Sequence, residues 1–207
     1  MTVAEPPRRR RLEPDARREQ ILDCAVRLFG ERPYAAVSTT EIARAAGVAR
    51  GLLNHYFGTK RDLYLEVVRR LVIVPGLERA AEGITGSLRT RVERSVDWYL
   101  DTVSLHGRTF VAVTGAEGFG ADPEIERILA EADNLAASAV LTAVGIPRDE
   151  QGAEQLAAVR TYGALAKAAV REWIRDGNLT REQLQLLLSQ TLITVVRDVL
   201  PRLRSVH

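Results

Sequence analysis

The sequence predicts an all-α protein made of a small N-terminal domain of three helices and a larger helical C-terminal domain. From about residue 15 onward, apolar residues recur at helical spacing, and no segment of the 207-residue chain alternates apolar and polar residues as a half-buried strand does. In addition, residues 38–62 predict two short helices that are joined by a glycine turn and lead into a third. A chain of this length buries roughly 70% of its unfolded surface, so it needs no disulfide to fold.

Residues 1–14 predict a flexible basic arm, because they contain three prolines and the run Arg8 to Arg11 and have little to bury. Such an arm has two uses. It can reach along a DNA backbone or into a minor groove, as homeodomain arms do, or it can be a solvated tail that adds weak non-specific attraction. The composition favours the solvated tail.

The first helix is predicted from about Ala16 to Phe29. Its apolar residues follow the spacing i, i+1, i+4, i+7 and i+8, which is one face of an amphipathic helix. These residues are Ile21, Leu22, Ala25, Leu28 and Phe29. We expect Gly30 and Pro33 to end this helix, and its apolar face to support the two helices that follow.

Local signals define those two helices. Ser38 and Glu41 stand three residues apart as a capping box does, so we expect a helix to begin at Thr39. Gly47 offers the left-handed backbone conformation that ends a helix. A second helix, from about Arg50 to Tyr56, then buries Leu53 and Phe57 on one side.

The order of these features, followed by Thr59 and Asp62 as a further capping pair, resembles the TetR family of bacterial transcription regulators. The resemblance covers about residues 16–65 and implies a DNA-binding helix-turn-helix. The chain departs from the family pattern at Ala49, where a serine usually caps the recognition helix, and at Asn54, where a tyrosine usually touches the DNA backbone. Asn54 therefore either contacts phosphate or reads a base, as asparagine does with adenine.

The resemblance and the outward helix face together imply two groups of DNA contacts. The residues expected to hold phosphates are Thr39, Thr40, Tyr56 and Lys60. The residues expected to reach base edges are Arg50, Asn54 and His55, with Gly51 allowing close approach of the backbone. Local alternatives remain open: threonines also suit the first turn of a helix, and Gly51 also relieves crowding between side chains.

The helix that opens at Lys60 carries an apolar stripe that ends before Pro75 and Gly76. Its stripe consists of Leu63, Val67, Leu71 and Val74. This helix is continuous with the DNA-reading unit, so we expect it to act as a lever. A short flexible segment is expected at residues 78–86. By function, we divide the chain into an arm (1–14), a helix-turn-helix domain (15–60) and a domain for ligand binding and dimerisation (61–207).

Beyond residue 86 every segment is helical by pattern. One stripe ends at His106, a short helix with loose ends follows between residues 108 and 120, and Asp122 with Pro123 opens the next helix as N-cap and first residue. A helix is expected at about residues 150–176. The last helix opens with the capping box of Thr180 and Gln183 and is expected to end at Leu200.

The last helix is apolar around more than half of its circumference, at positions 184, 186, 187, 188, 192, 193, 195, 196, 199 and 200. A single core does not cover that width. Two such helices from each of two chains bury it in a four-helix bundle, and the small residues Gly163, Ala164 and Ala168 allow close approach. TetR-like proteins dimerise in this way, so we expect a homodimer formed through the last two helices.

A ligand site is expected among aromatic and polar residues of the C-terminal domain. These residues are Trp98, Tyr99, Thr102, Phe110, Phe119 and Tyr162. Few charges fall among them, so they favour an apolar pocket for a hydrophobic or aromatic effector. The alternative, that they are ordinary core residues, stays open, and we expect His106 to be a helix-end residue.

The remaining features exclude other classes of protein. The three histidines and Cys24 show no metal-ligand or catalytic spacing, so we expect no cofactor, no metal and no enzymatic activity. Cys24 is expected to be a small buried apolar residue in a reducing compartment. There is neither an apolar run of 18 residues nor the apolar core of a signal peptide, so we expect a cytoplasmic protein that does not contact the membrane.

Charge supports an anionic partner for the N-terminal domain. Residues 1–70 contain 14 Lys and Arg against 9 Asp and Glu, whereas the rest of the chain contains 15 against 18. We therefore expect a regulator that binds an operator on double-stranded DNA, most often a repressor in the family it resembles, and that responds to a small molecule. The alternative is a helical protein-interaction regulator without sequence-specific DNA binding, which the polar outer face of Arg50, Asn54 and His55 argues against.

Overall fold

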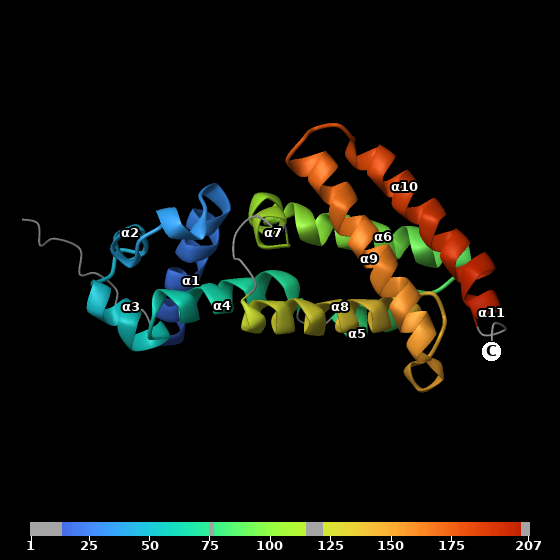
Figure 1. Cartoon of the computed structure of the whole chain (residues 1–207), viewed down its shortest axis with the longest axis horizontal. Helices are drawn as coiled ribbons and strands as arrows, with labels where there is room; N and C mark the ends of the chain where they lie inside the picture. Colours follow the sequence, from blue (N-terminus) through green and yellow to red (C-terminus); the bar gives the residue numbers. More distant parts are fainter. Residues whose placement is uncertain (1–13, 75–76, 115–121, 204–207) are drawn as a thin grey trace, which may run out of the picture.

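The computed structural model describes residues 14–74, 77–114 and 122–203, which form helices and connecting turns without a strand. The molecule is elongated, with α1, α2 and α3 at one end and α9 and α10 toward the other (Figure 1). The all-α architecture with a small N-terminal helical unit is therefore confirmed. Most of the predicted basic arm lies outside the described residues.

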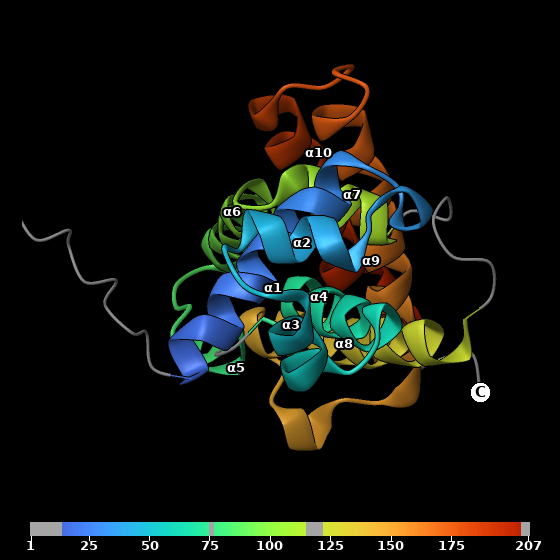
Figure 2. The same ribbon diagram turned by 90° about the vertical axis from the view of Figure 1, so that its left-hand side faces the viewer.

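Three helices form the N-terminal unit. α1 spans Pro14–Glu31, α2 spans Thr39–Ala45 and α3 spans Arg50–Phe57, with a short 3₁₀ turn at Tyr34–Ala36. Figure 2 shows α2 and α3 in front of α1 and α4 when the molecule is seen from this end. The apolar face predicted for α1 is buried, whereas Cys24, which we expected to be buried, is half-exposed and only packs against that core.

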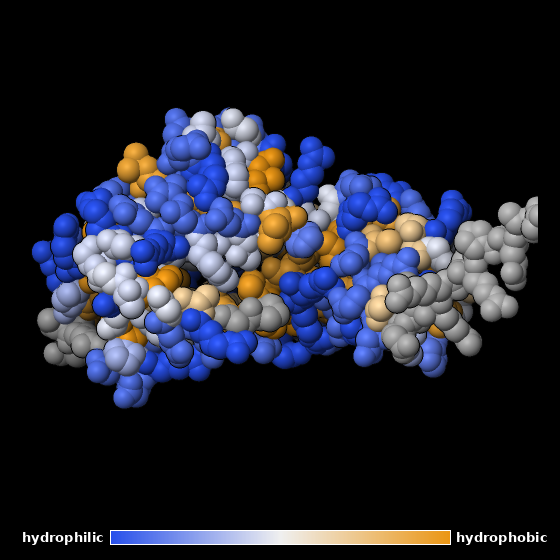
Figure 3. Space-filling model, turned by 180° about the vertical axis from the view of Figure 1, so that it is seen from behind, coloured by the Kyte–Doolittle hydropathy of each residue, from blue (hydrophilic) through white to orange (hydrophobic). Residues whose placement is uncertain are grey.

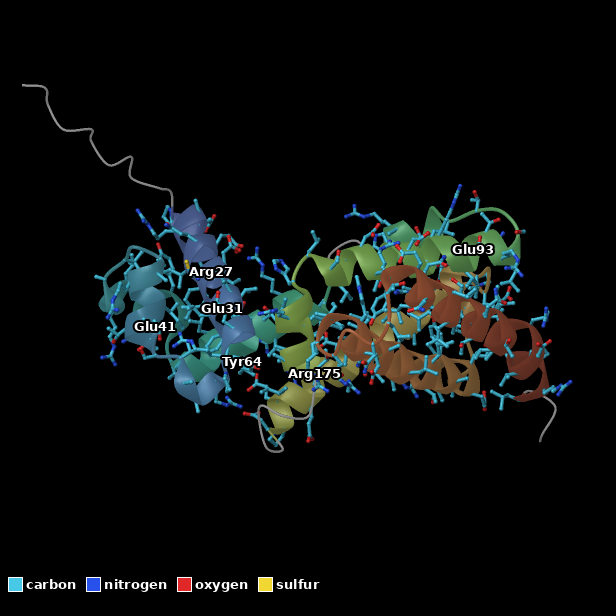
Figure 4. All side chains as sticks on the ribbon, turned by 90° about the horizontal axis from the view of Figure 1, so that it is seen from above. Arg27, Glu31, Glu41, Tyr64, Glu93 and Arg175 are labelled. Carbon is cyan, nitrogen blue, oxygen red and sulfur yellow. The ribbon has the colours of Figure 1, made fainter. Side chains whose placement is uncertain are left out.

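α4 joins this unit to the rest of the chain. It spans Lys60–Val72 and buries Leu63, Val67 and Val68 completely in the same core as α1 to α3. Tyr64 lies beside α1 (Figure 4), with its ring centroid 4.9 Å from that of Phe29, and burial raises its pKa to about 12. The core of the N-terminal unit therefore extends through α4.

The segment expected to be flexible contains a short helix. α5 spans Leu77–Glu82, so the expectation of a flexible segment at residues 78–86 was wrong for its first half. Its sequence, LERAAE, is made of strong helix formers, and Ala81 is buried against Ala139 and Ala143 of α8. Two small residues on α8 thus give this helix a close packing surface.

Three helices build the centre of the C-terminal part. α6 spans Leu88–Ser104, α7 spans Gly107–Thr114 and α8 spans Pro123–Ala143. The predicted cap of α8 is present, because the Asp122 carboxylate accepts from the backbone N–H groups of Glu124, at 3.0 Å, and Ile125. The short helix predicted between residues 108 and 120 is present as α7, and the rest of that segment, from residue 115, lies outside the described residues.

The last two helices pack beside one another at the end farthest from α2 and α3 (Figure 1). α9 spans Ala153–Ile174 after a 3₁₀ turn at Arg148–Glu150, and α10 spans Arg181–Thr194. The helix does not end before Pro201 as expected. It continues through a π-helical stretch, Val195–Val199, into α11, Leu200–Leu203. The wider π turn leaves room for the proline ring, which would otherwise collide with the carbonyl of residue 197.

Candidate functional site

The start of α2 is fixed by its neighbours. The Ser38 hydroxyl accepts from the backbone N–H of Glu41 at 3.1 Å, as predicted, and the Glu41 carboxylate is bound by Arg32. The hydrogen bond from Arg32 is the main reason that the pKa of Glu41 is lowered, and the backbone of Ser38 adds to it. These contacts hold the N-terminus of α2, where Thr39 is half-buried and Thr40 is exposed.

The helix-turn-helix places its predicted reading face in solvent. Gly47 adopts φ +63°, which turns the chain between α2 and α3, and Leu53 and Phe57 anchor α3 in the core. The outward residues of α3 are all exposed, and they are Arg50, Gly51, Asn54 and His55.

Two details of α3 bear on the sequence expectations. Ala49 precedes the helix without a side-chain cap, as its methyl group requires. A Cβ added at Gly51 would meet no heavy atom within 4 Å, so crowding within the chain does not explain the glycine. Close approach to a partner remains as its predicted role.

Lys60 has a partner inside the protein. Its Nζ donates to the backbone carbonyl of Tyr34 at 2.5 Å and lies 4.0 Å from the centroid of the Tyr34 ring, and burial lowers the pKa of Lys60. Tyr56 is half-buried against the N-terminal core. The contacts of both side chains with phosphate therefore stay predictions, and Lys60 must also contribute to folding.

The first turn of α4 is tied to α8. Thr59 and Asp62 form a complete capping box at the start of α4, as predicted. Arg61, the second residue of α4, donates to Asp122 at two distances of 3.0 Å, and this contact is the main cause that lowers the pKa of Asp122. Further along α4, Arg69 donates to Glu124 at 3.2 Å. Sequence spacing gave no signal for these contacts, which join residues more than fifty positions apart.

A cavity of about 330 Å³ lies in the C-terminal part. Its walls come from the end of α4, from α5 to α9 and from Leu192 of α10. It brings together five of the six predicted ligand contacts, which are Trp98, Tyr99, Thr102, Phe110 and Tyr162. The sixth, Phe119, lies outside the described residues. Tyr162 also belongs to the buried core, so the alternatives of pocket and core both apply to this residue.

Several polar residues of the cavity were missed by sequence reasoning. His106 does lie between two helices, as expected, but it also lines the cavity together with Arg70, Ser95, Asp133 and Lys167. Only Ser95 carried a usable signal, because it precedes the predicted Tyr99 by one helical turn. The others lie on helix faces whose orientation depends on tertiary packing.

The hydroxyl groups of the cavity differ in their partners. Tyr162 donates to the backbone carbonyl of Leu188 at 3.2 Å, and Thr102 donates to that of Trp98 at 2.8 Å. The Tyr99 hydroxyl, by contrast, is buried without a hydrogen-bond partner in the described part of the chain, and burial raises its pKa. The Lys167 ammonium and the Asp133 carboxylate form an ion pair at 2.5 Å.

Large apolar side chains remain exposed on α9 and α10. Leu165 is 39% exposed, Leu186 60% and Leu187 42%, and Val199 in the π-helical stretch is 38% exposed. On the face opposite to that of Figure 1, further hydrophobic residues gather near the middle of the molecule, between two largely hydrophilic ends (Figure 3). The apolar width predicted for the last helix is therefore not fully covered by the residues that the structure describes.

The described ranges contain neither a cluster of metal ligands nor a membrane-spanning helix. No group of three or more His, Cys, Asp and Glu side chains is placed to hold a metal ion there. Likewise, none of the helices in those ranges has both the length and the apolar character needed to cross a membrane.

The N-terminal unit is similar to known regulators. The family model described as bacterial regulatory proteins, tetR family, matches residues 21–67. The transcriptional regulator BetI of Rhizobium meliloti is 43% identical over 61 residues, which cover 30% of this chain and 30% of that protein. The matched stretch therefore spans less than half the length of the curated relatives.

The whole fold is similar to solved structures. A TetR-family transcriptional regulator from Streptomyces coelicolor has a TM-score of 0.73 and 27% identity, over 90% of this chain and 85% of that one. FadR from Bacillus subtilis, solved in complex with stearoyl-CoA, has a TM-score of 0.67 over 87% of this chain and 98% of that one. At 21% identity, the likeness to FadR is one of fold alone.

Proposed function

Because the chain belongs to the TetR family of bacterial regulatory proteins, we propose that it is a DNA-binding transcriptional regulator that responds to a small molecule. The observation that carries this proposal is the exposed polar face of α3, held on the buried anchors Leu53 and Phe57. In this proposal Arg50, Asn54 and His55 read base edges in a major groove. The phosphate contacts come from Thr39, Thr40, Tyr56 and Lys60, and Gly51 allows the backbone of α3 to approach the DNA closely.

We further propose that the regulator works as a homodimer through α9 and α10. The exposed leucines of these helices, Leu165, Leu186 and Leu187, provide the apolar surface that a four-helix bundle buries. Two copies of α3 then enter successive major grooves of a roughly palindromic operator. The functional division at residue 60 separates the reading unit from the domain that binds ligand and dimerises.

The proposed effector site is the cavity between α4 and α9. Its volume of about 330 Å³ is at the lower end of the range for small-molecule sites, and its lining is mostly apolar. The acyl-CoA complex of FadR is a precedent, on the same fold, for an effector with a large apolar part. We propose a hydrophobic or aromatic effector whose binding releases the protein from its operator, so that the protein acts as a repressor.

Helix α4 links the two sites in this mechanism. It begins at Lys60, beside the reading unit, and its last turn contributes Leu71 and Val72 to the cavity wall. An effector that displaces this turn tilts α4 and changes the distance between the two helix-turn-helix units of the dimer. The coupling is reciprocal, so DNA weakens effector binding by the factor by which effector weakens DNA binding.

An electrophoretic mobility shift with the DNA that flanks the gene tests the DNA-binding proposal. We expect a specific, salt-sensitive complex. The double substitution Arg50→Ala and Asn54→Ala should abolish the preference for this DNA over random DNA of equal length. The matched control is Arg89→Ala, which removes an exposed arginine of α6, and it should leave the preference intact.

Lys60→Ala should behave differently from the reading-face variant. It should weaken binding to all DNA alike and reduce the slope of log K against log salt by about 1. Because Lys60 is bound to Tyr34, the thermal midpoint must be measured alongside. Binding by the parent protein that is no tighter for the flanking DNA than for random DNA at equal salt would refute the regulator and leave the protein-interaction alternative.

A further inference from the structure

Two hydroxyl groups on one face of α6 point to the chemistry of the ligand. Ser95 and Tyr99 are one helical turn apart, and both line the cavity. The side-chain oxygen of each is buried without a hydrogen-bond partner among the residues that the structure describes. Buried polar groups are normally paired, so two unpaired hydroxyls on one wall indicate a site that takes a polar group from a bound molecule.

The charged residues of the same cavity have partners in the protein. Lys167 pairs with Asp133 at 2.5 Å, and Arg70 of α4 is bound by Glu19 and Asp23 of α1. Arg160 is exposed and donates to the side chain of Asn134 at 3.0 Å. Except at His106, which is exposed and also lines the cavity, a ligand carboxylate or ammonium entering the cavity would have to displace one of these partners or lose its hydration without compensation.

We propose that the cavity binds an apolar molecule that carries one uncharged polar group, such as a hydroxyl or a carbonyl, which is hydrogen-bonded by Tyr99 and Ser95. This proposal rests on the proposed function, in which the cavity is the effector site. It excludes effectors that would bury a charged group in the cavity. A hydroxyl or carbonyl oxygen accepts from the Tyr99 phenol, and the Ser95 hydroxyl either donates to it or accepts from a ligand hydroxyl. The apolar remainder of the molecule fills the cavity.

Three probes with the same chain and different heads test the proposal. Decanol, decanoate and decylammonium are titrated into DNA-free protein at neutral pH, below their aggregation concentrations, with calorimetry as the measurement. We expect decanol to bind at least about tenfold more tightly than either ion, since a desolvated and unpaired charge is far more costly than an unpaired hydroxyl. Equal or tighter binding of decanoate or decylammonium, or no binding of any probe, would overturn the proposal.

Two tyrosine variants separate a ligand contact from a structural role. Tyr99→Phe should reduce decanol affinity about tenfold while leaving the thermal midpoint unchanged or raised, because the lost hydroxyl has no protein partner. Tyr162→Phe is the matched control on the same cavity: it should lower the thermal midpoint, because its hydroxyl donates to Leu188, and change decanol affinity less.

The outcomes of the variants decide the proposal independently of the DNA assays. Unchanged decanol affinity in Tyr99→Phe, or a thermal midpoint that falls as it does in Tyr162→Phe, would show that Tyr99 is an ordinary core residue. Because the titrations use protein without DNA, a failure of operator binding refutes the regulator but not the ligand chemistry. Conversely, failed titrations leave the operator assay unaffected.

Discussion

The contact between α1 and α7 provides a sensitive test of how tightly the N-terminal unit is packed against the C-terminal part. Gly30, in the last turn of α1, lies against Thr109 of α7, whose hydroxyl donates to the backbone carbonyl of Val26 at 3.2 Å. A Cβ added at Gly30 would overlap the Thr109 hydroxyl oxygen and lie 3.0 Å from its Cβ and 3.3 Å from its Cα. Gly30→Ala is therefore a small substitution at a place without room for it.

Two opposed effects determine the result of this substitution. Alanine is favoured over glycine inside a helix by about 1 kcal/mol, whereas inserting a methyl group into a close-packed contact costs about 1–3 kcal/mol. Rotation of Thr109 does not remove the conflict, because it breaks the bond to Val26 and leaves the 3.0 Å approach of the two Cβ atoms. Because the overlap involves three atoms of Thr109 at once, we take the upper part of that cost, about 2–3 kcal/mol, and after subtracting the helix preference of about 1 kcal/mol we expect a net loss of about 1–2 kcal/mol in the free energy of unfolding.

Urea unfolding of the four proteins of a double-mutant cycle measures the interaction energy between residues 30 and 109. In the background of Thr109→Ala the overlap with the hydroxyl is gone but the 3.0 Å approach of the two Cβ atoms remains, so adding Gly30→Ala should cost less than it does in the parent. The interaction energy between the two substitutions should be about 1 kcal/mol. A Gly30→Ala variant as stable as the parent, or one that loses the same free energy in both backgrounds, would show that α1 and α7 do not pack as described.

Two further predictions concern charge and assembly. Arg61 holds the pKa of Asp122 below its ordinary value of 3.8, so the stabilisation from Asp122 is present above that value and is lost as pH falls through the lower folded pKa. Asp122→Asn retains a side chain that can cap α8, but the free energy of unfolding of this variant, measured by urea titration, should depend less on pH below about 4 than that of the parent. An unchanged pH dependence would contradict this. The double substitution Leu186→Glu and Leu187→Glu should convert the proposed dimer to monomer, as measured by sedimentation at micromolar protein concentration. The control Gln190→Glu, at an exposed position of the same helix, should leave the dimer intact. A parent protein that is already monomeric would refute the dimer.

Local signals in the sequence were sufficient for most helix boundaries. Ser38, Thr59, Asp122 and Thr180 each cap a helix in the structure, because capping depends on residues only two or three positions apart. For the same reason, Gly47 ends α2 as expected. The face of α3 left to solvent also followed from the chain alone, since burying two residues four apart fixes the opposite side of a short helix.

The features that escaped prediction depend on residues distant in sequence. α5 forms because it packs against small residues of α8. The last helix continues past Pro201 because a π-helical stretch precedes the proline. The sequence placed Lys60 at the DNA surface but gave no sign that the carbonyl of Tyr34 holds its ammonium. The unpaired hydroxyls of Ser95 and Tyr99 were equally invisible, since the lack of a partner is a property of the whole packing arrangement.

The position of α4 explains how a cavity in the C-terminal part is able to affect a reading face at the far end of the molecule. Val67 and Val68 are fully buried in a core that α4 shares with α1 to α3 and with Ile125 and Ile128 of α8, so α4 is closely packed against both the reading unit and the start of α8. The last turn of α4 forms part of the cavity wall, and its first turn is fastened to α8 through Arg61 and Asp122. On the proposed function, a bound effector displaces the last turn while the ion pair restrains the first, so α4 pivots near Arg61 and the reading face swings with it. Asp122→Asn removes that restraint, and it should therefore weaken the effect of effector on operator binding more than it weakens either binding step alone.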